Sequence, residues 1–126
     1  MALAATTFVL AWWSMGLASG DSAIAAVWPA NAVVLAFLLK SPVRRWPLLL
    51  ASGWIGNLVA GVALRGDLTG PLGLSLCNTL EIATCALIVR RLCGPDLDLS
   101  KRRSLLVFAA AALVSSLCGA VSAAGY

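Results

Sequence analysis

The sequence predicts an all-α protein, a polytopic transmembrane helix bundle with about five membrane-spanning helices. Hydrophobic residues make up 61% of the 126 residues, charged residues make up 11%, and the mean hydropathy is +0.96. Soluble domains instead contain about 45–50% apolar and about 25% charged residues. The apolar residues form continuous runs of about 20 residues, the length that spans a bilayer as a helix. These runs lack the alternation of a transmembrane β-barrel, so they predict helices.

The first two predicted helices are residues 3–20 and 22–39, separated only by Gly20 and Asp21. A cleaved signal peptide is the alternative for the first segment, because small residues end it. The lack of a Lys or Arg before its apolar part favours a retained helix. The second helix contains Pro29, which removes one backbone hydrogen bond. We therefore expect a kink at Pro29.

The other three predicted helices are residues 46–64, 69–90 and 104–124. The third begins after a short basic loop. The fourth has Pro71 in its first turn, where proline is tolerated, and the Gly94-Pro95 pair should stop its extension. The fifth follows the longest polar connection of the chain.

The positive charges predict how the helices cross the membrane. Eight of the nine Lys and Arg residues lie in residues 40–45 and 90–103, and the ninth, Arg65, lies between these segments beside Asp67. Basic loops stay on the cytoplasmic side. We therefore expect both basic loops and the N-terminus in the cytoplasm, and the end of the fifth helix outside.

Four polar side chains inside the apolar runs are the candidate functional residues: Asn31, Asn57, Asn78 and Glu81. At about 1.5 Å of rise per residue, all four should lie within roughly 5 Å of the bilayer midplane. A carboxylate at that depth is costly and usually faces the bundle interior. We expect Glu81 to face Asn57, Asn31 or a small water-filled cavity. The alternative is a hydrogen-bonded set that only holds the helices together.

Several further residues bear on how this polar layer is enclosed. Trp28 and Pro29 are candidates for a pocket wall beside it, with lipid or core packing as the alternative. Trp46, at the cytoplasmic edge of its helix, suits an interfacial anchor. Small residues spaced by four predict close helix contacts and would also permit a homodimer; they are Ser52, Gly56 and Ala60, Gly53, Asn57 and Gly61, and Ser115, Gly119 and Ala123.

The composition argues against catalysis and against nucleic-acid binding. The chain has no His, and its four Cys form no CxxC pair, so no metal or cofactor site is predicted. No nucleophile motif or phosphate-binding loop is present. The basic residues lie in short loops between apolar runs, which indicates topology and not a nucleic-acid surface. We therefore expect that the chain is not an enzyme.

Several motifs, taken in order, give the sequence a family resemblance. They are VWPANAVVLAFLL at 27–39, RRWP at 44–47, GNL at 56–58, CNTLE at 77–81 and VRR at 89–91. In their order and spacing they resemble the bacterial membrane-associated sensor domain of the first MASE type. The likeness runs from about residue 27 to the end of the chain. Many members have Gly at the positions of Asn31 and Leu48, and the first of these departures would change ligand preference.

The resemblance implies a sensory input module of the bacterial inner membrane with about eight helices. Such domains precede cytoplasmic outputs, which include diguanylate cyclases, cyclic-di-GMP phosphodiesterases and histidine kinases. Asn57, Asn78 and Glu81 match family hallmarks. Because the predicted topology leaves the end of the fifth helix outside, we expect residues 1–126 to be the first part of a sensor domain.

The resulting hypothesis is a multi-pass sensor that signals by changing helix packing when Glu81 is protonated or a ligand binds. Its expected partners are the lipid bilayer, an unknown signal or ligand, and a cytoplasmic output in a longer chain or in a partner protein. Part of a secondary transporter is one alternative, because transporters also place polar residues beside broken helices at the midplane. A small structural or assembly protein of the membrane is the other.

Overall fold

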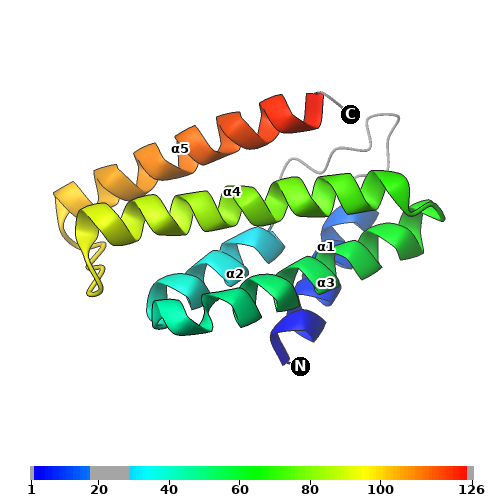
Figure 1. The fold of residues 1–126 in the computed structure, drawn as a ribbon, viewed down its shortest axis with the longest axis horizontal. Helices are drawn as coiled ribbons and strands as arrows, with labels where there is room; N and C mark the ends of the chain where they lie inside the picture. The colour runs from blue at the N-terminus through cyan, green and yellow to red at the C-terminus, as the bar shows by residue number, and fades with distance from the viewer. Residues whose placement is uncertain (1, 18–28, 125–126) are drawn as a thin grey trace.

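A computed structural model describes residues 2–17 and 29–124 of the chain. These residues form five α-helices and one turn of 3-10 helix, and they contain no strand (Figure 1). The elements are α1 (Ala2–Leu17), α2 (Pro29–Lys40), η1 (Val43–Arg45), α3 (Trp46–Arg65), α4 (Thr69–Cys93) and α5 (Arg102–Ala124). The prediction of an all-helical chain is therefore confirmed for the described residues.

The last three helices agree with the predicted segments to within three residues at each end. Two glycines with positive φ explain where α3 and α4 stop: Gly66 at 73° and Gly94 at 78°. Glycine adopts this left-handed conformation without steric cost. Helix α4 extends to Cys93, three residues beyond the predicted end, and Gly94 caps it. Pro29 is the first described residue of α2, so the kink predicted there concerns a segment outside the described residues.

The helices pack at close range through the glycines of α3. A methyl group added at Gly56 would lie 2.7 Å from Thr7 Oγ1 and 2.8 Å from the backbone oxygen of Ala4 on α1. At Gly53 it would lie 2.8 Å from a Val34 methyl carbon on α2. Such distances are shorter than carbon atoms tolerate, so only glycine fits. The close packing predicted from the small-residue rows of this helix is confirmed.

Figure 1 shows how the helices are arranged around α4. Helix α1 crosses behind α3, and α5 runs along α4 on the side away from α1 and α3. Helices α2 and α3 both pack against α4, and α1 contacts α2 as well as α3. Helix α4 is therefore the element to which α2, α3 and α5 all attach.

Trp46 belongs to the core, and the prediction that it is an interfacial anchor is wrong. Its side chain is 7% exposed and packs with Val34, Leu38, Ile82 and Ala86. Its indole Nε1 donates to the Leu38 carbonyl oxygen at 2.9 Å. That carbonyl lies in the last turn of α2 and also accepts a hydrogen bond from the Ser41 backbone nitrogen at 3.1 Å. The indole thus adds a second hydrogen bond to this acceptor, which gives its buried N–H a partner at the α2–α3 turn.

Length and composition bear on how many of the described helices could cross a membrane. Among the described helices, Val43–Leu64 and Thr69–Cys93 are long and apolar enough to cross a membrane. As described, α1 has 16 residues and α2 has 12, fewer than the roughly 20 that a bilayer requires. The prediction of about five spans is therefore not confirmed.

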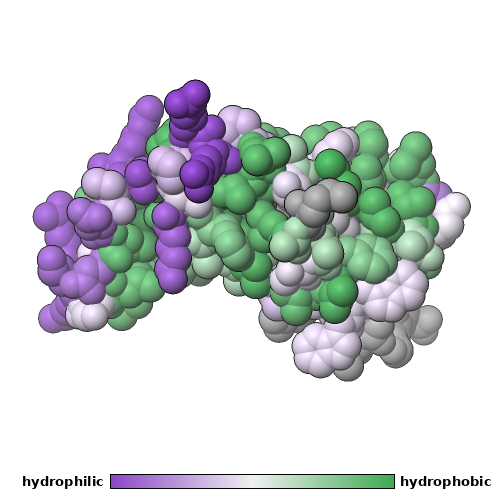
Figure 2. Space-filling view, turned by 90° about the horizontal axis from the view of Figure 1, so that it is seen from below, coloured by the Kyte–Doolittle hydropathy of each residue, from purple (hydrophilic) through white to green (hydrophobic). Residues whose placement is uncertain are grey.

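Hydrophilic residues gather at one end of the molecule, and most of the remaining surface in view is hydrophobic (Figure 2). This end is where α2 and α4 finish and where α3 and α5 begin (Figure 1). It therefore carries both basic connections, residues 40–45 and 90–103. The two segments that the charge pattern assigned to one side of the membrane lie at the same end of the bundle.

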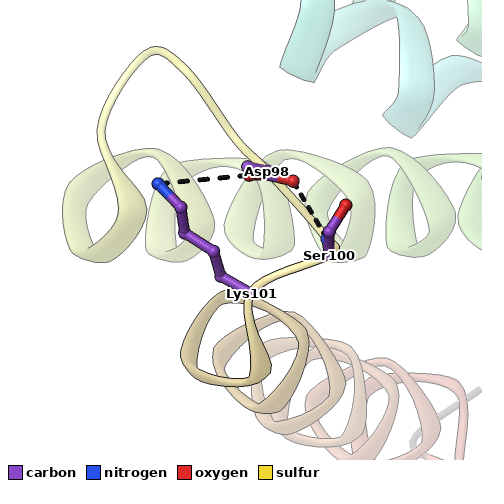
Figure 3. A network of polar contacts seen from close by, with 3 residues as sticks. All are labelled: Asp98, Ser100 and Lys101. Atoms are coloured by element: carbon purple, nitrogen blue, oxygen red, sulfur yellow. Dashed lines mark hydrogen bonds and ion pairs between the residues drawn. The ribbon is translucent and has the colours of Figure 1, made fainter.

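The connection between α4 and α5 contains a compact polar turn (Figure 3). Asp98 Oδ1 accepts a hydrogen bond from the Ser100 backbone nitrogen at 3.0 Å, and Lys101 Nζ lies 4.0 Å from Asp98 Oδ2. Hydrogen bonds from the Ser100 side chain and backbone, with a smaller contribution from the Lys101 charge, hold the pKa of Asp98 below its usual range. The turn leads directly into the first residue of α5.

Candidate functional site

Asn57 and Asn31 join α3 to α2. Asn57 Nδ2 donates a hydrogen bond to Asn31 Oδ1 at 3.3 Å. Asn57 is 6% exposed, and its own Oδ1 is buried without a hydrogen-bond partner among the described residues. The amide of Asn57 is held in place because Gly53 and Gly61, one turn away on either side, let α2 and α4 approach α3.

Glu81 joins α4 to α5 through a partner that the sequence did not predict. The Ser116 hydroxyl donates to Glu81 Oε1 at 2.7 Å, a length typical of a hydrogen bond to a carboxylate. Glu81 makes no hydrogen bond to Asn57 or Asn31 in the part of the chain that the structure describes. The Ser115-Ser116 pair within the apolar fifth segment was the available signal, but Ser115 was considered only for packing.

Glu81 and Asn31 nevertheless meet at one small cavity. The cavity has a volume of about 90 Å³. Its polar lining residues come from three helices: Asn31 of α2, Glu81 and Cys85 of α4, and Ser115 and Ser116 of α5. Because the Asn57 amide donates to the Asn31 side chain, the cavity is connected through one hydrogen bond to α3 as well.

Ser115 gives the cavity an unsatisfied hydroxyl. Its side chain is 1% exposed and lies beside the Cys85 thiol, and no hydrogen bond of good geometry satisfies Ser115 Oγ within residues 2–17 and 29–124. Leaving a buried hydroxyl unpaired costs about 1–3 kcal/mol. A cavity of roughly 10–15 Å³ holds one water molecule, so this one admits several waters or a small polar ligand.

The remaining candidate residues do not line this cavity. Asn78 is half-buried on α4, one turn before Glu81, and is not part of the lining. Pro29 is half-buried at the first position of α2 and also lies outside the lining. Trp28, the other candidate for a pocket wall, lies outside the described residues. The structure thus brings Asn31, Asn57 and Glu81 into one neighbourhood and leaves Asn78 and Pro29 at its edge.

The chemistry available at this cavity is proton exchange and hydrogen bonding. A carboxyl group, two hydroxyls, a thiol and an amide can bind water, a proton or a small polar molecule. Among the described residues, no group of three His, Cys, Asp or Glu side chains lies close enough to hold a metal ion. The arrangement also couples helices, since each polar group contacts a neighbour on another helix or faces the shared space.

Comparisons with known proteins give one match. The family model of MASE1, a membrane-associated sensor domain, matches residues 1–126, the whole chain. No curated protein and no solved structure matches the chain.

Proposed function

The chain belongs to the MASE1 family of membrane-associated sensor domains, and from this premise we propose that its signal site is the polar cavity around Glu81. The observation that carries the proposal is the hydrogen bond from Ser116 to Glu81 at the wall of a cavity that Asn31 also lines. Polar groups are expensive inside a membrane protein and are retained there for packing or for function. A cavity lined by an ionisable group and an unsatisfied hydroxyl favours a functional role of these residues over a role in packing alone.

In the proposed mechanism, the signal competes for the Glu81 carboxylate. Protonation of Glu81 makes its carboxyl group a weaker acceptor, and a polar ligand that donates to Glu81 replaces Ser116 as the donor. Either event weakens the hydrogen bond from Ser116 to Glu81. Helix α5 then packs differently against α4. Asn31 lines the same cavity and is hydrogen-bonded to Asn57, so the change also reaches α2 and α3. Couplings of about 1–3 kcal/mol are typical of such linked equilibria and change an occupancy by roughly 5- to 150-fold.

The proposed topology has about five spans in these residues, with the N-terminus in the cytoplasm of a bacterial inner membrane. The gathering of both basic connections at one end of the bundle supports this orientation. A reporter enzyme that is active on only one side of the membrane tests it. We expect cytoplasmic activity for fusions after Pro42 and external activity for fusions after Asp67, and the reverse result contradicts the orientation.

The proposed partner is a cytoplasmic output, in a longer chain or in a separate protein. A diguanylate cyclase, a cyclic-di-GMP phosphodiesterase or a histidine kinase would each convert helix movement into chemistry. The one carboxyl group of the cavity is hydrogen-bonded to the Ser116 hydroxyl on another helix, an arrangement that suits a change in helix packing. We therefore assign catalysis to the output and signal reception to this chain.

The test measures output in the full-length protein that carries this chain. Glu81→Gln keeps the shape of the side chain and removes its titration, and Glu81→Ala removes both. We expect Glu81→Gln to lock the output at one level regardless of pH, and Glu81→Ala to reduce the response to the signal at least tenfold. Thr84→Val, at an exposed position of the same helix, is the matched control and should signal as the wild type does.

Output is compared at equal abundance in the membrane fraction, so that loss of folding is not mistaken for loss of signalling. Wild-type responses in both Glu81 variants would remove this residue from the mechanism. Solute uptake that depends on Glu81 would instead favour a transporter. Full function after replacement of the whole polar layer by apolar residues would favour a structural role.

A further inference from the structure

A second, larger cavity extends toward the hydrophilic end of the bundle and shares Ala32 and Leu35 with the lining of the small cavity at Glu81. It has a volume of about 430 Å³, within the roughly 300–1,000 Å³ of typical ligand sites. Helices α2 and α5 both pack against α4, and the space between them is closed at one end by the connection that follows α4. We refer to this space, lined by Leu35, Leu39, Lys40, Asp96, Leu97 and Phe108 among others, as the α2–α5 groove.

The groove is apolar along its length and charged at one end. Leu35 and Leu39 of α2, Leu97 of the connection and Phe108 of α5 line its apolar part. The charged lining residues, Lys40 and Asp96, belong to the last position of α2 and to the connection. A ligand that fits this pattern has an apolar chain and a polar head at one end.

The charge near the polar end favours an anionic head. Arg90 Nη1 lies 3.4 Å from the Leu39 carbonyl oxygen, to which it donates, so its guanidinium group is held at the end of α2 next to Lys40. Of the two acidic residues in the connection, Asp98 is already engaged by Ser100 and Lys101. Asp96 is thus the acidic group that remains to offset the positive charges of Lys40 and Arg90, so the net charge at this end of the groove is positive.

The surrounding surface is basic as well, although the residues that make it so do not line the groove. Six further basic residues lie in the same two connections and adjoining helix ends: Arg44, Arg45, Arg91, Lys101, Arg102 and Arg103. Hydrophilic residues gather at this end of the molecule (Figure 2). In membrane proteins, basic pockets between helices on the cytoplasmic side bind the head groups of anionic lipids.

We propose that the α2–α5 groove binds one anionic phospholipid of the surrounding membrane, with an acyl chain between Leu35 and Phe108 and the phosphate at Lys40 and Arg90. The proposal rests on the membrane association of the family and is independent of the role of Glu81. A lipid bound here contacts α2, α5 and the connection between α4 and α5 at once. Its presence therefore sets the spacing of the helices whose relative movement we assign to signalling.

The test is native mass spectrometry of the full-length protein in mild detergent, titrated with three lipids of identical acyl chains. We expect phosphatidylglycerol to bind with one tight site, phosphatidylethanolamine to bind more weakly, and diacylglycerol, which has no phosphate, to bind least. Equal binding of diacylglycerol and phosphatidylglycerol would overturn the proposal. So would displacement of the lipid by soluble glycerol 3-phosphate, which would indicate a site for a free phosphate compound.

Three substitutions locate the binding. Lys40→Gln should weaken phosphatidylglycerol binding about fivefold, the effect of one basic residue at a membrane surface, and Asp96→Asn should strengthen it. Ala36→Trp, at an exposed position that lines the groove, should block binding without disturbing the core. Unchanged binding in both Lys40→Gln and Ala36→Trp would overturn the proposal.

Two control variants separate this site from general effects. Arg44→Gln removes an exposed cation from the same end without touching the groove, and Ala63→Trp adds the same bulk at an exposed position of α3. Both should retain wild-type affinity, and a loss as large as that of Lys40→Gln would indicate unspecific attraction and overturn the proposal. Glu81→Gln should also bind the lipid normally, so the lipid site and the signal site fail or succeed separately.

Discussion

The hydroxyl of Ser116 on α5 donates a hydrogen bond to the Glu81 carboxylate on α4 at 2.7 Å, and the two residues are 35 positions apart in the sequence. The acceptor lies inside the longest helix of the structure, and the donor lies on the helix that packs along it. The same two residues line the small cavity with Asn31. In the mechanism that we propose, a change at Glu81 would therefore act on the contact between α4 and α5.

Replacing Ser116 by Ala should destabilise the packing of α5 on α4. Hydrogen bonds between helices in membrane proteins contribute about 0.6–2 kcal/mol, so Ser116→Ala should lower the free energy of unfolding by about that amount. Unfolding in mixed micelles measures it. Ser116→Thr keeps the hydroxyl and is the control. A double-mutant cycle with Glu81→Ala, which removes the acceptor, isolates the pair, and additive effects of the two substitutions would contradict a direct interaction.

Asn31 and Asn57 should respond unequally to the loss of their hydrogen bond. Asn31→Leu leaves the buried amide of Asn57 with no partner for donor or acceptor, so it should cost about 1–3 kcal/mol. Asn57→Leu removes the already unsatisfied Oδ1 and leaves Asn31 at the cavity, where water can reach it, so it should cost less. The free energies of unfolding of the two variants in detergent test this order. Equal losses, or a larger loss for Asn57→Leu, would contradict it.

The helices could be predicted from the sequence better than the contacts between them. Continuous apolar runs indicated where most helices lie, and the Gly94-Pro95 pair indicated where one of them ends. Both signals can be read from a short stretch of sequence without knowledge of the fold. Three polar residues, Asn31, Asn57 and Glu81, could be singled out because a polar residue is conspicuous in an apolar run, and the structure brings them close together; their functional role stays a prediction. The partner of Glu81 was missed because α5 is apolar almost all round, so periodicity does not indicate which face meets α4.

Trp46 is a second residue whose contacts could not be predicted from the sequence. Its position at the edge of a predicted span suggested an interfacial anchor. Burial follows instead from the turn between α2 and α3, which brings the indole under the Leu38 carbonyl. Residue type and depth were available from the sequence, whereas the path of the turn was not. The α2–α5 groove was missed for the same reason, because its lining comes from three separate segments.

Gly56 should tolerate no larger residue. Gly56→Ala places a methyl group 2.7 Å from Thr7 Oγ1 and 2.8 Å from the Ala4 backbone oxygen, and overpacking of this kind costs about 1–3 kcal/mol. The helix propensity of Ala returns up to about 1 kcal/mol, so the net effect should be destabilising. Thermal unfolding in detergent measures it. Ala51→Ser, an addition of one atom at an exposed position of α3, is the control, and equal stability of the two variants would contradict the close approach of α1 to α3.

The turn before α5 should lose its stabilisation in acid. Because the folded-state pKa of Asp98 lies below its usual range, its ionised form stabilises the turn above the unfolded-state pKa of about 3.9. That contribution is lost as the pH falls through the lower folded-state pKa. Ser100→Ala removes the side-chain hydrogen bond that lowers the pKa most, so it should move the pKa of Asp98 upward toward the usual value. A titration of the Asp98 carboxyl carbon by NMR measures both proteins, with Ser104→Ala as the control on α5. An unchanged midpoint in Ser100→Ala would contradict the assignment, and it would leave the hydrogen bond from the Ser100 backbone as the main cause of the lowered pKa of Asp98.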